Sequence, residues 1–200
     1  MGKDQAKTYV ITSAQYNGLV NKDFLAGLEK YCSEHEAELL VLPMRGKDIT
    51  QDMMDPLLTE YLHQTSFKMG TKLNDKIKAH NYPILQQMID PITGLARFPQ
   101  SDVSTIFASP KQRLKVVPNS NNTLPKMLMT TGAVTRPNYN TDNRQGIIAD
   151  HDHVYGAIVV EIVDNVHYHY RQLSAQKNGP FVDFGVKYSG KETEKAVLEA

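Results

Sequence analysis

An uninterrupted apolar run, Glu38 to Met44 (ELLVLPM), is the feature that most restricts how this 200-residue chain can fold. It lacks any alternation of apolar and polar residues, which is typical of a strand buried on both faces. Thr8 to Ala14 (TYVITSA) is a second short run of apolar and β-branched residues. Between the two, apolar residues recur at helical spacing from Phe24 to Cys32, and Asn21 can cap that helix. The order strand, helix, strand predicts a βαβ unit at the start of the chain.

The middle of the chain gives weaker patterns. Asp55-Pro56 is typical of a helix start, and the apolar residues that follow predict a short helix. Phe67 to His80 predicts a second helix, interrupted by Gly70, and Ile84 to Ile89 predicts a strand that ends in a turn.

After Arg97 the pattern changes to short β runs separated by polar loops. Strands are predicted over residues 103–108, 114–117, 126–131, 156–163 and 166–173, and Asp164-Asn165 predicts a two-residue hairpin turn. The predicted fold class is therefore α/β, with a βαβ start, a mixed sheet and an antiparallel β-rich second half.

We expect residues 1–200 to form a single domain. Residues 1–96 make the βαβ and helical part, residues 97–188 the basic, β-rich part, and residues 189–200 a charged, helix-prone tail that could link to a further C-terminal segment. Apolar residues are 40% of the chain, and the only cysteine, Cys32, lies on the apolar face of the predicted helix. With no run long enough to span a membrane, the sequence predicts a cytoplasmic protein without a membrane partner.

Charge is segregated along the chain, although the formal net charge is zero. Residues 97–147 contain seven basic and two acidic residues, a net charge of +5, while the flanking segments are acidic. Such asymmetry predicts a polyanionic partner, either nucleic acid or a phosphorylated ligand. The alternative is a solvated loop region that happens to be basic.

Hydroxyl groups surround Gly132 at the end of a predicted strand, an arrangement that can bind an anion, and Tyr139 adds a stacking surface. With the neighbouring cations, this segment resembles a groove for single-stranded nucleic acid. The predicted nucleic-acid-binding residues are Lys111, Arg113, Lys115, Lys126, Arg136, Tyr139 and Arg144.

A second candidate site lies beyond the carboxyl ends of the first two predicted strands, where ligands bind in open α/β sheets. Its residues are Ser13, Gln15, Asn17, Arg45 and Lys47, a set suited to a phosphate or a carboxylate. Neither the dinucleotide nor the P-loop glycine pattern is present, and the alternative is that these are ordinary polar loop residues.

Four histidines fall between His151 and His169. In each pair, His151/His153 and His167/His169, the spacing would place both side chains on one face of a strand. The predicted hairpin pairs Ile162 with His167, which separates the two pairs by the length of a strand. We therefore expect no metal site, although His151 and His153 come nearest to one, and hydrogen bonding or phosphate contact is the alternative role.

Three longer strings, YVITSAQYN, LPKMLMTTGAVTRPNYN and HDHVYGAIVVEI, together resemble the N-terminal region of tailed-phage proteins of the DNA-transfer or early DNA-processing type. The resemblance implies that longer members continue into a calcineurin-like metallophosphoesterase segment, which would require Mn or Mg. That enzyme class needs D-x-H, G-N-H and G-H-x-H motifs, and none occurs in residues 1–200. No cofactor is therefore expected in this chain.

Three functions follow as hypotheses. The first is an N-terminal binding or regulatory domain of a phage DNA-processing protein, with DNA and a C-terminal phosphoesterase segment as partners and the host cytoplasm as its location. The second is a small enzyme or binder that acts on a nucleotide or another phosphorylated ligand. The third is a non-catalytic protein that binds a host factor.

Overall fold

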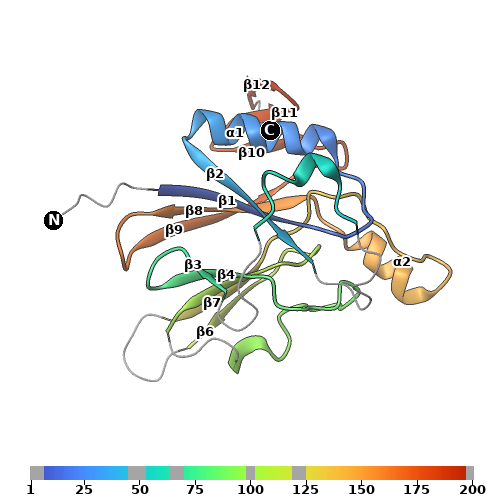
Figure 1. Cartoon of the computed structure of the whole chain (residues 1–200), viewed down its shortest axis with the longest axis horizontal. Coiled ribbons are helices and arrows are strands. Elements are labelled where there is room, and N and C mark those ends of the chain that lie inside the picture. The colour runs from blue at the N-terminus through green and yellow to red at the C-terminus, as the bar shows by residue number, and fades with distance from the viewer. Residues whose placement is uncertain (1–6, 45–52, 64–69, 98–101, 119–124, 197–200) are drawn as a thin grey trace.

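Two mixed β-sheets pack face to face in the computed structural model, which describes residues 7–44, 53–63, 70–97, 102–118 and 125–196 (Figure 1). Sheet I has the strand order β2-β1-β8-β9, and sheet II has the order β3-β4-β5-β7-β6. A third, three-stranded sheet and helix α1 lie on the far side of sheet I. The mixed α/β fold class is as predicted.

The βαβ start is confirmed: it consists of β1 (Lys7–Ala14), α1 (Lys22–Glu34) and β2 (Ala37–Pro43), and β1 pairs with β2 in parallel. Sheet I is completed by β8 (Gly156–Ile162), antiparallel to β1, and by β9 (Tyr168–Ser174), antiparallel to β8. The first two strands of the chain thus form a sheet with a segment that follows more than a hundred residues later.

Strand β2 is buried on both faces, as its unbroken apolar run predicts. Leu39 and Val41 pack in the cluster that includes α1, while Leu40 and Leu42 pack in the cluster between the two sheets. The predicted helix cap is also confirmed, because the Asn21 side chain accepts a hydrogen bond from the Phe24 N–H at 3.2 Å.

Sheet II has a parallel centre with antiparallel edges. Strands β4, β5 and β7 run parallel to one another, β3 pairs antiparallel with β4, and β6 pairs antiparallel with β7. The apolar runs of the sequence predict three of these strands. Their bounds are β3 Thr71–Lys72, β4 Ile77–His80, β5 Ser104–Phe107, β6 Leu114–Val117 and β7 Lys126–Thr130.

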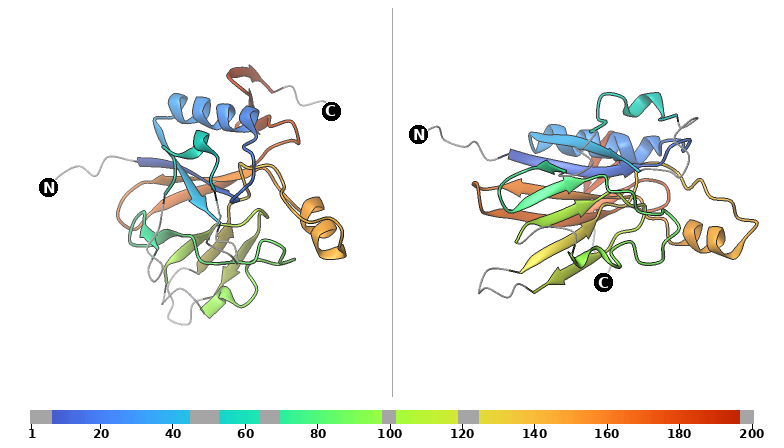
Figure 2. Two further views of the ribbon diagram at one scale, coloured as in Figure 1. Left: turned by 45° about the vertical axis from the view of Figure 1, so that its right-hand side comes forward. Right: turned by 60° about the horizontal axis from the view of Figure 1, so that its bottom comes forward.

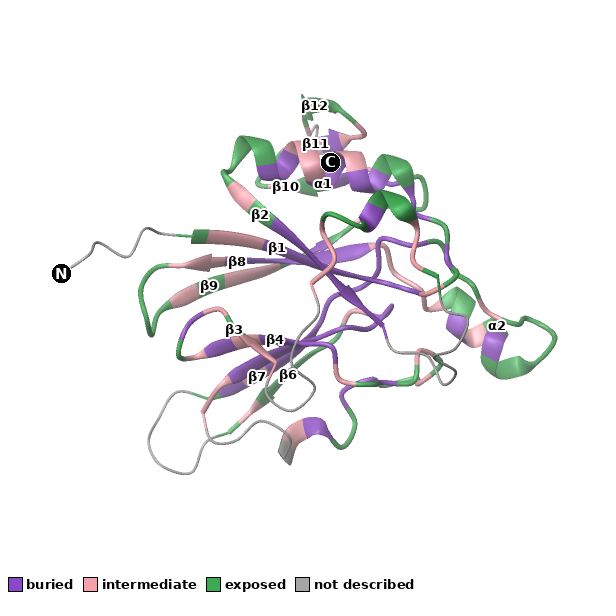
Figure 3. Ribbon diagram, in the orientation of Figure 1, coloured by how far each residue is buried: buried purple, intermediate pink, exposed green. Residues whose placement is uncertain are grey.

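The third sheet is formed by β10 (Phe181–Asp183), β11 (Val186–Ser189) and β12 (Glu192–Lys195), which are antiparallel. The left view of Figure 2 shows it beside α1, above sheet I. Stacked rings of Phe181 and Tyr188, with centroids 5.0 Å apart, pack against this helix as part of the same core cluster. The second helix, α2 (Arg144–His151), projects from the body and is largely exposed (Figure 3).

Cys32 is buried on α1, where desolvation raises the pKa of its thiol to about 12. This agrees with the structural role expected from its position on the apolar face of the helix.

Several local predictions were wrong where tertiary pairing overrode local propensity. The described part of the predicted helix 67–80 forms β3 and β4 instead, because Ile77 and Ala79 are buried between the sheets beside β5. Residues 84–89 form a turn-rich segment that covers the outer face of sheet II, not a strand. The helix after Asp55 is a single 3₁₀ turn, η1 (Pro56–Leu58), and the described part of the charged tail is strand β12.

The predicted hairpin exists, but its turn is longer than two residues. Ile162 pairs with Tyr168, not with His167, and Glu161 pairs with His169. Asp164 explains the difference, because one carboxylate oxygen accepts hydrogen bonds from the backbone N–H groups of Val166 and His167 at 2.7 Å each. These hydrogen bonds to the Asp164 side chain stabilise a loop that is wider than the predicted two-residue turn. His153 precedes β8 and His167 follows it, so the two histidine pairs still lie at opposite ends of that strand.

Candidate functional site

The polar side chains at the end of β1 are engaged in hydrogen bonds within the protein. Ser13 is fully buried, and its hydroxyl donates to the Gly132 carbonyl at 2.5 Å. Gln15 is 1% exposed and donates from Nε2 to Gln86 Oε1 at 2.6 Å. Asn17 is exposed, adopts a left-handed conformation, and accepts a hydrogen bond from the Met53 N–H at 3.1 Å. Arg45 and Lys47 lie outside the described residues.

The hydroxyl residues around Gly132 are also buried. Thr131 and Thr135 are fully buried, and Thr135 Oγ1 accepts a hydrogen bond from the Gln15 N–H at 3.0 Å. Gly132 has φ of +81°, and a Cβ built on it would lie 2.8 Å from the Gly156 Cα. This segment therefore joins the ends of β1 and β8 and does not present its hydroxyl groups to solvent.

A pair of partly buried hydrogen bonds ties the largely exposed 136–143 loop to the body. The Tyr139 hydroxyl lies 3.1 Å from His153 Nδ1, and His153 Nε2 lies 2.8 Å from the Thr135 carbonyl oxygen. Since a carbonyl only accepts, Nε2 carries the proton and Nδ1 accepts from the tyrosine. Tyr139 thus anchors the loop, a role that local sequence did not indicate.

Burial shifts both groups toward their neutral forms. Desolvation lowers the pKa of His153 to about 4, and desolvation together with the Asp150 charge raises the pKa of Tyr139. Both side chains are neutral near pH 7, which suits a fixed hydrogen bond between them.

The basic residues of segment 97–147 separate into buried and exposed groups. Lys111 is fully buried and lies 3.3 Å from an Asp152 carboxylate oxygen, and Lys126 is only 9% exposed. Neither presents the exposed side chain that the sequence pattern implied. The exposed members are Arg113 just before β6, Lys115 on β6, Arg136, and Arg144 at the start of α2.

A cleft of about 890 Å³, lined by both polar and apolar side chains, opens beside the N-terminus of α1. Its lining includes Asn21, Arg136, Asp150, Tyr155 and Lys177. Two backbone hydrogen bonds and one side-chain hydrogen bond assemble it. The Arg136 N–H donates to the Leu19 carbonyl at 2.7 Å, and the Ala175 N–H donates to the Tyr155 carbonyl at 2.8 Å. The Asn21 side chain donates from Nδ2 to the Lys177 carbonyl at 3.4 Å. The cleft therefore joins residues that are distant in sequence.

Charges of both signs line this cleft. Arg136 and Lys177 supply two cations, while Asp23 and Asp150 supply two carboxylates. His151 also faces the cleft, and its side chain is 87% exposed. Lys177, Asp23 and Tyr155 were missed by sequence reasoning, because each belongs to an element that shows no local pattern of a binding site.

The two histidines that came nearest to a metal site do not share a strand. His151 ends α2 and contacts the Asp152 carboxylate at 3.1 Å, and Asp152 is the C-terminal cap of that helix. His153 has both ring nitrogens in hydrogen bonds. Among the described residues, no group of three or more histidine, cysteine or acidic side chains is placed to hold a metal ion.

Comparison with known proteins identifies a distant phage relative. The chain is 25% identical over 190 residues to Protein A1 of Escherichia phage T5. The similarity covers 90% of this chain and 34% of the phage protein, so the chain spans about a third of that relative's length. No protein-family model and no solved structure matches the chain. In the part of the chain that the structure describes, no helix is long and apolar enough to cross a membrane.

Proposed function

We propose that this chain is a non-catalytic binding domain of a phage DNA-processing protein, and that the cleft beside α1 binds single-stranded nucleic acid. The observation that carries the proposal is that Arg136, Lys177 and Tyr155 line the same cleft of about 890 Å³. Cations flanking an aromatic ring are the elements with which proteins bind a single strand, through its phosphates and one stacked base.

The two carboxylates refine the kind of ligand. A site built only for phosphate would exclude Asp23 and Asp150, because their charge opposes an anion. Carboxylates accept hydrogen bonds from the amino groups of bases, so a nucleotide can satisfy both signs of charge. The mixed lining therefore favours a nucleic-acid strand, with its backbone toward Arg136 and Lys177, over a bare phosphate.

The surrounding protein is part of the same proposal. The chain spans about a third of phage T5 Protein A1, which leaves room in such a protein for another segment. The resemblance of this sequence to phage proteins with a phosphoesterase segment suggests that this segment, with Mn or Mg, would carry the chemistry. The binding domain would then act in the host cytoplasm and deliver DNA to it.

Fluorescence anisotropy with a labelled single-stranded oligonucleotide tests the cleft. Arg136→Ala/Lys177→Ala should weaken binding at low salt and reduce the salt slope by about 0.7 for each phosphate that the variant no longer neutralises. Lys187→Ala/Lys191→Ala is the control, because it removes the same charge from the third sheet, away from the cleft lining. Equal weakening in the two variants, or no binding by the unmodified chain, would overturn the proposal.

Arg113→Ala/Lys115→Ala gives a second comparison. These exposed cations lie at the start of β6, Arg113 just before it and Lys115 on it, and their charges act on Asp90. If this variant alone abolished binding, the nucleic acid would bind on sheet II and not in the cleft.

A further inference from the structure

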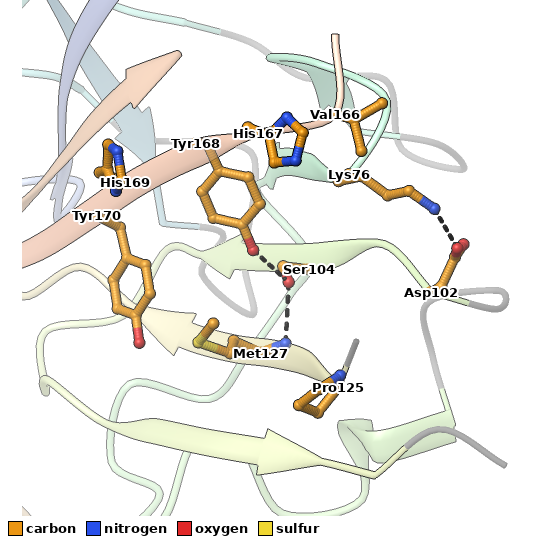
Figure 4. A pocket seen from close by; sticks show the side chains of 10 residues that line it. All are labelled: Lys76, Asp102, Ser104, Pro125, Met127, Val166, His167, Tyr168, His169 and Tyr170. Carbon is orange, nitrogen blue, oxygen red and sulfur yellow. Dashed lines mark hydrogen bonds and ion pairs between the residues drawn. The ribbon is translucent and has the colours of Figure 1, made fainter. Parts of the chain in front are cut away.

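A largely apolar groove of about 480 Å³ lies where sheet I and sheet II face each other at one end (Figure 4). Tyr168 and Tyr170 of β9 form one wall, and Ser104 of β5 and Met127 of β7 form the other. The Tyr168 hydroxyl donates to Ser104 Oγ at 2.7 Å and bridges the two sheets inside the groove.

Strand β6 extends the apolar face of this groove to the edge of sheet II. Val116 lies directly opposite Met127, and Leu114 lies opposite Met129. Directly opposed side chains of an antiparallel pair share a face, so Leu114 and Val116 lie on the groove side of sheet II. They are 47% and 53% exposed, an apolar surface that nothing in the described residues covers.

The backbone of β6 presents unused hydrogen-bonding groups at the same two residues. The Thr130 N–H donates to the Arg113 carbonyl at 3.0 Å, which makes residues 113 and 130 a hydrogen-bonded pair. Hydrogen-bonded and non-hydrogen-bonded pairs alternate along an antiparallel ladder. The N–H and C=O groups of Leu114 and Val116 therefore point away from β7, and no described strand pairs with that edge.

The opposite face of β6 is cationic. Lys115 lies opposite Leu128, which packs in the cluster on the outer face of sheet II, and both Arg113 and Lys115 are exposed. Asp90 lies near both cations, whose charges help to lower its pKa, and it balances only one of them. A strand added beside β6 would therefore meet apolar side chains on one face and positive charge on the other.

We propose that the outer edge of β6 is a docking site for an extended segment of a partner protein, which adds to sheet II as a further strand. The alternation on β6 specifies the segment: apolar side chains toward Leu114 and Val116, carboxylates toward Arg113 and Lys115, and backbone groups paired with those of Leu114 and Val116. This site is independent of the cleft beside α1, with which it shares no lining residue.

The test uses the full chain and a fluorescein-labelled peptide in which valine and glutamate alternate. Two controls accompany it: a peptide of the same composition with the valines and glutamates in blocks, and the alternating peptide with every second backbone amide methylated. Anisotropy should register binding of the alternating peptide below about 1 mM, with at least about tenfold weaker binding of either control. Equal binding of all three peptides, or none, would overturn the proposal.

Two substitutions at one position locate the contact. Val116→Lys places a charge on the apolar face, and Val116→Pro removes an outward N–H without taking a donor from the β6–β7 ladder. Each should weaken peptide binding at least about tenfold, while Val182→Lys, a change at a 51% exposed valine on β10, should leave it unchanged. Unfolding curves of each variant distinguish weaker binding from failure to fold, and unchanged binding by folded Val116→Lys would refute the site.

Self-association is the competing outcome. Strand β12 is exposed and carries Glu192 and Glu194, so the edge of a second copy could meet Arg113 and Lys115. Light scattering coupled to size-exclusion chromatography should give a monomer for the unmodified chain. A larger species that Val116→Lys dissociates would assign the edge to a second copy and overturn the assignment to a partner protein.

Discussion

Lys111 is fully buried, and its ammonium group lies 3.3 Å from the carboxylate of Asp152, the residue that caps helix α2. The lysine comes from the connection between β5 and β6, so this ion pair fixes the projecting helix to sheet II. Asp152 is about a quarter exposed, and its pKa is lowered by His151 first and by Lys111 next.

We predict that Asp152→Ala destabilises the protein by about 3 kcal/mol, because a buried ammonium group loses its partner. This loss of stability is at the lower end of what breaking a buried ion pair costs, because Asp152 is partly exposed to water. Lys111→Met/Asp152→Ala should recover most of the stability by removing the buried charge itself. Urea unfolding curves measure both changes. A double variant no more stable than Asp152→Ala alone would contradict this explanation.

Gly132 and Gly94 provide a matched pair of left-handed glycines, with φ of +81° and +80°. A Cβ at position 132 would lie 2.8 Å from the Gly156 Cα, while one at position 94 would meet nothing within 4 Å. Gly94→Ala should therefore cost only the conformational penalty, about 1 kcal/mol. Gly132→Ala should cost at least about 2 kcal/mol more, because backbone must move. Equal destabilisation of the two variants in thermal unfolding would show that the segments around Gly132 and Gly156 separate easily.

His153 should make stability depend on pH. Its pKa is lowered from 6.5 to about 4, so the unfolded chain binds more protons between these values. The resulting stability is fully present above pH 6.5 and is lost as the pH falls toward 4. Linkage gives a decrease of about 2 kcal/mol between pH 7.5 and pH 5.

His153→Gln should flatten this dependence, since glutamine does not titrate and retains a donor for the Thr135 carbonyl. Unfolding free energies of the two proteins at both pH values provide the measurement. A parallel decline in the variant would assign the pH dependence to other groups.

Asp150→Asn distinguishes the ligand classes of the cleft. The asparagine carbonyl can still accept a hydrogen bond from a base amino group, whereas the negative charge that repels the phosphates is gone. If a nucleic-acid strand binds, the substitution should therefore strengthen binding, by up to about 1 kcal/mol for an exposed charge. A cationic ligand would bind more weakly to the same variant. Anisotropy titrations at two salt concentrations show whether Asp150→Asn raises or lowers the affinity. Weaker binding of the oligonucleotide by this variant would contradict the proposed orientation of the strand in the cleft.

Local sequence determined the elements whose signals come from contiguous residues. The unbroken apolar run of β2 required burial on both faces. Asn21 caps α1 by accepting a hydrogen bond from the N–H of Phe24, only three residues away. The β runs that became β5, β6 and β7 were also recognisable, because each side-chain pattern reflects the faces of its own strand. The physical reason is that periodicity and capping act over a few residues.

Only the tertiary structure decided which polar side chains remain exposed. Lys111 and Arg113 are two residues apart and equally basic, yet the first is buried against Asp152 and the second is exposed just before β6. Ser13 and Gln15 lie at a strand end that predicts a ligand site, yet Ser13 donates to the Gly132 carbonyl and Gln15 to Gln86. The cleft residues Arg136, Tyr155 and Lys177 come from separate segments, which are joined by two backbone hydrogen bonds and one from the Asn21 side chain. A sequence contains the charges and hydrogen-bonding groups, but their burial and pairing depend on long-range packing that no local pattern encodes.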